Sequence, residues 1–62
     1  MAHSLHYHIN ESALAIEAEA GKLFDLVVML NDAGDIELAW AVSIQAQKLI
    51  DAAVSLRAAM AG

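Results

Sequence analysis

Apolar residues recur every three or four positions through the first half of the chain, which is the pattern of a helix with one apolar stripe. Between residues 13 and 30 the spacings alternate 3, 4, 3, 4, 3 without a break. The positions that carry this stripe are Ala13, Ile16, Ala20, Leu23, Val27 and Leu30. We predict a helix over about residues 11–31, with Asn10 or Ser12 as its N-cap residue.

A turn at residues 31–35 separates this helix from a second helix, predicted from about residue 36 to residue 60. Gly34 suits the left-handed backbone that often ends a helix. Asp35 can cap the helix that follows. Because the connection is short, the two helices are expected to return antiparallel as a hairpin.

The second helix carries two apolar stripes side by side. The first contains Leu38, Val42, Leu49, Leu56 and Met60, with Ala46 and Ala53 between them. The second contains Ile36, Trp40, Ser43, Gln47, Ile50 and Val54. On the first helix, Phe24 and Val28 flank the main stripe in a similar way. Each helix of a hairpin has only one neighbour, so this outer set is expected to stay exposed in a single chain.

Burial of one large apolar side chain contributes about 2 kcal/mol, so a chain that leaves the whole outer set in water loses on the order of 10 kcal/mol of stabilisation. This is comparable with the stability of a whole domain and with the cost of association, about 4–15 kcal/mol. We therefore predict an all-α fold, an antiparallel hairpin that dimerises into a four-helix bundle. The expected interface residues are Ile16, Leu23, Phe24, Val27, Val28, Leu30, Ile36, Trp40, Gln47, Ile50 and Val54. Gln47 either reaches water at the edge or pairs with its symmetry mate and fixes the register.

An N-terminal arm, residues 1–9, precedes the hairpin of residues 10–62. The segment from Leu5 to Ile9 alternates apolar and polar residues, which fits a short strand or the frayed start of the helix. A strand would have to pair with the same strand of a second copy. In a strand His6 and His8 would share a face, and two copies would offer four nitrogens to zinc. His3, His6 and His8 are the only candidate metal ligands of the chain, and the alternative is that they face solvent.

The composition supports one small helical domain of 62 residues. Fourteen alanines, three glycines and no proline favour long helices. The absence of cysteine excludes a disulfide framework and a thiolate zinc site. With 60% hydrophobic and 18% charged residues, ordinary disorder is excluded. No signal-peptide pattern and no apolar run of about 20 residues is present, so a cytoplasmic protein without a membrane partner is expected. The small size favours a bacterial or phage protein.

The net charge of −5, with only Lys22, Lys48 and Arg57 as cations, gives little affinity for phosphates. Catalysis and a cofactor are not expected, because the helices hold no histidine to serve as a base and no phosphate-binding glycine loop. The leading hypothesis is a non-enzymatic homodimeric module or regulator that binds another protein.

The alternative function is a nucleic-acid-binding regulator of transcription or of RNA. The order strand, helix, helix is that of ribbon-helix-helix repressors. However, the predicted helices are long for that fold, and the strand lacks Arg, Lys, Asn or Gln at the positions that would read bases. A dimer of antiparallel hairpins is similar in length and helix arrangement to Rop-type RNA-binding proteins, with no shared motif.

Overall fold

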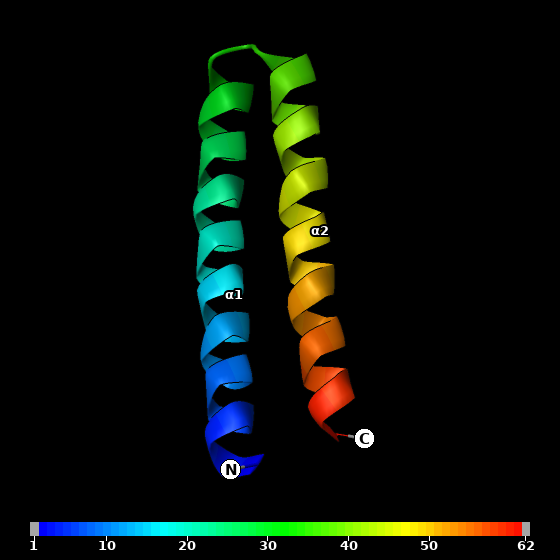
Figure 1. Ribbon diagram of the computed structural model, residues 1–62. Helices are drawn as coiled ribbons and strands as arrows, with labels where there is room; N and C mark the ends of the chain where they lie inside the picture. Colours follow the sequence, from blue (N-terminus) through cyan, green and yellow to red (C-terminus); the bar gives the residue numbers. More distant parts are fainter. Residues whose placement is uncertain (1, 62) are drawn as a thin grey trace.

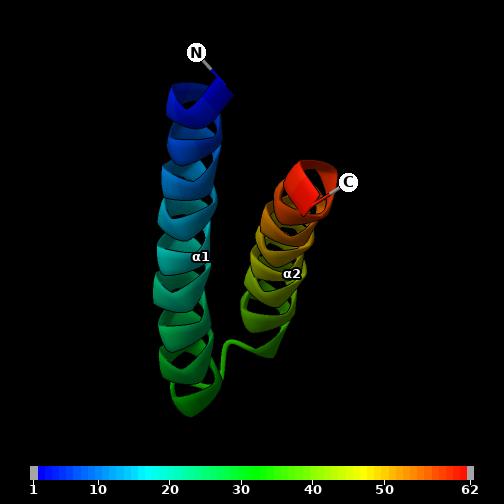
Figure 2. The same ribbon diagram turned by 90° about the horizontal axis from the view of Figure 1, so that it is seen from below.

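The computed structural model describes the backbone of residues 2–61 and the side chains of residues 5–61. Two helices make up the fold, α1 (Ala2–Asp32) and α2 (Ile36–Ala61). They run antiparallel, side by side, in an elongated hairpin of 50 × 16 × 10 Å (Figure 1). Seen from below, the two helices form a single layer, and no other described element covers either face (Figure 2). The predicted all-helical hairpin is confirmed.

The start of α1 corrects one prediction. The helix begins at Ala2 rather than near residue 11, so Asn10 and Ser12 both lie inside α1 and neither is its N-cap. An interior Asn costs only a fraction of a kcal/mol relative to Ala. In addition, Ile9 is half-buried and extends the apolar stripe by one more step before Ala13. Residues 2–9 are therefore helical in the single chain, whereas a strand paired across a dimer involves a second copy and stays a prediction.

The turn forms as predicted, and its hydrogen bonds explain why the chain reverses there. Gly34 has a φ of 85°, the left-handed conformation that favours glycine. The Asp35 N–H donates to the Leu30 carbonyl at 2.9 Å, and the Gly34 N–H donates to the Asn31 carbonyl at 3.0 Å. This pair of bonds is the Schellman motif that ends α1.

Asp35 also starts α2. Its side-chain Oδ1 accepts a hydrogen bond from the Leu38 N–H at 3.4 Å, and its carbonyl accepts one from the Ala39 N–H at 3.0 Å. This is the geometry of an N-cap residue. One aspartate thus closes the first helix through its N–H and opens the second through its oxygens.

The core between the helices is made of alanine. The buried residues of the described chain are Ala13, Ala20, Ala39, Ala46 and Ala53. Small side chains let the two backbones approach closely, and the larger residues of the stripe are only half-buried beside this contact. These half-buried residues are Ile9, Ile16, Leu23, Val27, Leu30, Val42, Leu49, Leu56 and Met60. We call the buried and half-buried positions of this set the packed stripe.

The packed stripe of α2 begins at Ala39, not at Leu38 as predicted. Ala39 is buried, whereas Leu38 is about half exposed. The positions 38, 42 and 46 would place two spacings of four in succession, which turns the stripe away from α1. Beginning at Ala39 keeps the alternation of three and four along the whole helix.

Candidate interaction surface

A second set of positions lies one residue after the packed stripe on each helix and continues with the same spacing to Tyr7 and Ile36. We call the surface that they form the open face. On α1 it contains Tyr7, Asn10, Leu14, Glu17, Gly21, Phe24 and Val28. On α2 it contains Ile36, Trp40, Ser43, Gln47, Ile50, Val54 and Arg57. The spacings within each set again alternate between three and four, so the open face follows the full length of the hairpin.

The ion pair between Glu17 and Arg57 shows that both halves of the open face lie on the same side of the hairpin. Glu17 follows Ile16 of the packed stripe, and Arg57 follows Leu56. Arg57 Nη1 donates a hydrogen bond to Glu17 Oε2 across the two helices. In an antiparallel pair, equivalent flanking positions meet along one edge of the contact. The remaining open-face positions therefore share that edge.

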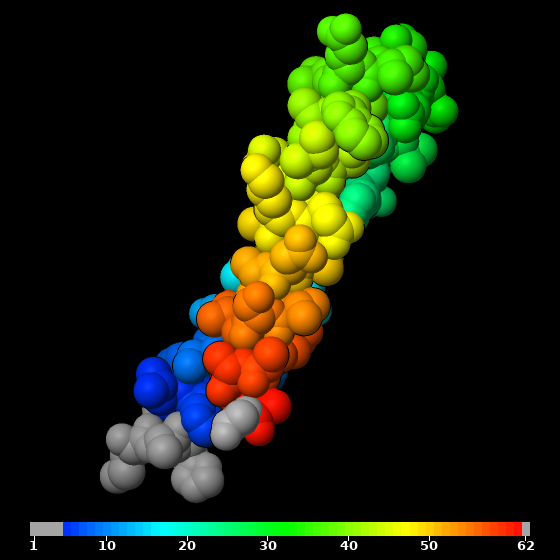
Figure 3. All heavy atoms as spheres, turned by 90° about the vertical axis from the view of Figure 1, so that its right-hand side faces the viewer, coloured from blue at the N-terminus to red at the C-terminus, as the bar shows by residue number. Residues whose placement is uncertain are grey.

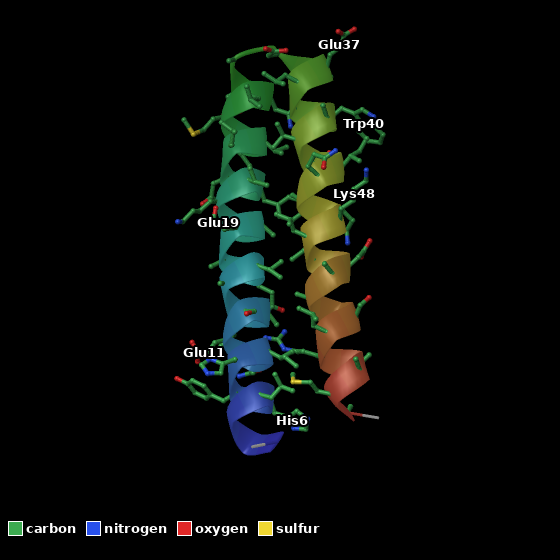
Figure 4. All side chains as sticks on the ribbon, viewed as in Figure 1. His6, Glu11, Glu19, Glu37, Trp40 and Lys48 are labelled. Atoms are coloured by element: carbon green, nitrogen blue, oxygen red, sulfur yellow. The ribbon has the colours of Figure 1, made fainter. Side chains whose placement is uncertain are left out.

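Large apolar side chains dominate the open face. Trp40 is 67% exposed, Ile36 is 61% exposed and Val28 is 60% exposed. All three aromatic residues of the chain, Tyr7, Phe24 and Trp40, belong to this face. Aromatic residues are enriched at protein interfaces and at their binding hot spots. Figure 4 shows the Trp40 side chain projecting from α2 away from α1.

Charge is almost absent from the open face. Glu17 and Arg57 neutralise one another there, and every other charged residue of the helices lies elsewhere. Five acids lie on the outer side of their helices, far from the packed stripe: Glu11, Asp25, Asp32, Glu37 and Asp51. Figure 4 shows Glu11 and Glu19 projecting from α1 away from α2. The hairpin is thus apolar on one face and acidic on its outer sides.

In the described chain, Glu17 and Arg57 are the two residues whose pKa values depart clearly from their ordinary values. The hydrogen bond from Arg57 lowers the pKa of the Glu17 carboxyl below its ordinary value of 4.5. The same bond raises the pKa of Arg57. Both side chains remain about one-third exposed, so water screens part of their attraction. The pair shows which edges of the helices meet, and it contributes little to stability.

Two polar residues of the open face, Gln47 and Ser43, form hydrogen bonds within their own helix. Gln47 Nε2 donates to Asp51 Oδ1 at 3.1 Å, and Ser43 Oγ donates to the Trp40 carbonyl at 2.8 Å. Neither side chain is buried and unpaired in the single chain. Gln47 is exposed, as expected for an edge position, and its pairing with a symmetry mate stays a prediction.

The helical N-terminus separates the candidate metal ligands. Two residues apart on a helix, His6 and His8 point about 200° apart, so they do not share the face that a strand would have given them. The His8 ring instead contacts Tyr7 edge to face, with ring centroids 5.7 Å apart. Among the described residues, no group of three or more potential ligands comes together.

The described part of the chain has no cavity that would hold a small molecule. Viewed onto the α2 edge, the space-filling surface is a slender rod (Figure 3). Neither helix, over the residues described, has an apolar stretch long enough to cross a bilayer.

The expected interface residues divide into two groups. The first group packs within the hairpin: Ile16, Leu23, Val27 and Leu30. The second group lies on the open face: Phe24, Val28, Ile36, Trp40, Gln47, Ile50 and Val54. Sequence reasoning missed Tyr7 and Leu14 as members of the open face, although they lie in a seven-residue series with Val28.

Comparison of the chain with protein-family models, with curated proteins and with solved structures gives no match.

Proposed function

We propose that this protein is a small acidic homodimer that acts as a non-enzymatic interaction module. In this proposal the open face holds a second copy, and the two hairpins form a four-helix bundle. The observation that carries the proposal is the offset between the stripes. The open face lies one residue, or about 100°, around each helix from the packed stripe. In a square bundle each helix has two neighbours about 90° apart, so the two stripes fit two neighbours.

The size of the open face supports a second copy as its occupant. The layer measures 50 Å by 16 Å, so one copy offers roughly 800 Å² to its partner, the size of a standard stable interface. The single hairpin also exposes 4502 Å². A compact protein of this mass exposes roughly 3,900 Å². In the dimer, covering one face on each copy would remove this excess of exposed area.

Charge supports the same occupant. The chain carries a net charge of −5, and two such chains repel one another unless they meet through a neutral surface. The open face is that surface, because its only charges form the Glu17–Arg57 pair. In the dimer the outer acids stay in water, where a further protein partner would meet them. This arrangement is the basis for a role as an adaptor or regulator.

Two adjacent residues give a matched test. Val28 lies on the open face and is 60% exposed, whereas Met29 lies off it and is 66% exposed. We expect the wild-type protein to sediment at twice the chain mass of 6.6 kDa. Val28→Glu should sediment as a monomer, because it buries an unpaired charge in the dimer. Met29→Glu should remain dimeric, and equal behaviour of the two variants would refute the proposal.

The proposed binding of another protein has its own tests. Affinity capture from the native host, with Met29→Glu and Val28→Glu as baits, should recover a protein partner that depends on the dimer. The nucleic-acid alternative predicts a complex with DNA or RNA at low salt that weakens as salt rises. We expect no such complex.

A strand paired across the dimer would place residues 5–9 in an extended conformation, which backbone chemical shifts would reveal.

A further inference from the structure

We infer that the two hairpins of the dimer pack with their turns at opposite ends. This inference rests on the proposed dimer. Two-fold symmetry allows two ways to lay one open face on another with the helices aligned. Either both turns lie at the same end and α1 faces the partner's α2, or the turns lie at opposite ends and each helix faces its own counterpart. In both arrangements neighbouring helices are antiparallel, so helix dipoles do not decide between them.

The two ends of the hairpin differ in charge. Residues 23–47, which form the turn half, contain no lysine or arginine. They carry four acids: Asp25, Asp32, Asp35 and Glu37. The opposite end is formed by residues 2–10 and 58–61, which contain no acid and include all three histidines. Each hairpin therefore has one negative end and one end without acids.

This difference favours opposite ends. With both turns at one end, six acids gather within the last turns of the bundle, namely Asp32, Asp35 and Glu37 of each copy. Packed helices lie about 8–10 Å apart. That separation is close to the screening length of about 8 Å at physiological salt, so the repulsion is only partly screened. With the turns at opposite ends, each acidic turn lies beside an end of the partner that contains no acid.

A distance between two turns distinguishes the arrangements. The chain has no cysteine, so an Ala33→Cys variant takes a single nitroxide spin label on the exposed turn. We expect pulsed electron paramagnetic resonance to give a separation close to the 50 Å length of the hairpin. The same-end arrangement would instead give roughly one helix spacing of 10 Å plus the label tethers, and this result would overturn the inference.

A second labelled variant separates the failure of this inference from the failure of the dimer. Ala52 is exposed, lies near the middle of the hairpin and is outside the open face. A label at Ala52→Cys should give nearly the same separation in both arrangements. A short distance at Ala33 together with a dimer signal at Ala52 would overturn the orientation and leave the dimer in place. Loss of dipolar coupling at both positions would overturn the dimer and, with it, the orientation.

Discussion

The packed stripe is lined by alanine, whereas the open face beside it carries all three aromatic residues of the chain. The packed stripe gains from close approach of two backbones, and it buries little side-chain area. No large side chain of the described residues is fully buried. The open face has the opposite properties, with large side chains and no neighbour. The contrast supports the proposed dimer, because many of the residues that would supply most burial energy are those that the single chain leaves in water.

Removing the largest side chain of the open face should have the largest effect. Trp40→Ala deletes a hot-spot type residue that is 67% exposed in the single chain, so it should cost the hairpin itself little. In the dimer we expect a loss of about 2–4 kcal/mol in association free energy, measured by sedimentation equilibrium.

Trp40 is also the only tryptophan, so its fluorescence reports association directly. Dilution of the wild-type protein should shift the emission to longer wavelength as the indole returns to water. An emission that is independent of concentration, in a chain that sediments at 6.6 kDa, would contradict burial of Trp40 by a second copy.

Enlarging the packed stripe should have the next largest effect. Ala46 is fully buried between the helices, and Ala46→Leu forces the two backbones apart. We expect a loss of about 1–3 kcal/mol in the free energy of unfolding, measured by urea denaturation. Ala18→Leu, at an exposed alanine of α1, is the control and should change stability little. Equal effects of the two substitutions would show that the alanine contact does not limit the approach of the helices.

A substitution at Gly21 tests how closely a second copy approaches the open face of α1. In the single chain, a Cβ built at this helical glycine meets no heavy atom within 4 Å, apart from its two chain neighbours and the backbone of its own helix. Gly21→Ala should therefore stabilise the protein by about 0.5–1 kcal/mol through helix propensity alone, measured by thermal unfolding. A loss of stability would instead show that the backbone of a second copy approaches α1 at this point.

The alternation of three and four was enough to predict the hairpin, because it fixes which side of each helix faces inward. The choice of Leu38 over Ala39 failed because the residue was selected for its size, whereas spacing decides burial. The start of α1 was missed because the alternation from Leu5 to Ile9 suits both a strand and a helix. Local pattern does not separate the two over so short a segment.

The Glu17–Arg57 contact was missed for a different reason. The two residues are 40 positions apart, and their meeting depends on the register of the two helices. Gly34 and Asp35 set that register through the turn. The halves of the open face on α1 and α2 lie on the same side of the hairpin because of this register. The sequence therefore indicated an apolar stripe on each helix without showing that the two form one surface.

The smallest expected effect concerns this ion pair, which links α1 and α2 within the open face. The pKa of Glu17 is lowered in the folded state, so its charged form stabilises the protein above the ordinary pKa of 4.5. That contribution is lost as the pH falls through the lowered value. The difference in unfolding free energy between wild type and Glu17→Gln should therefore be present at pH 7 and shrink below about pH 4.5, as urea denaturation at both pH values would measure. Glu11→Gln, on the outer surface, is the control for general effects of acid, and a difference that is independent of pH would show that Glu17 acts through packing rather than charge.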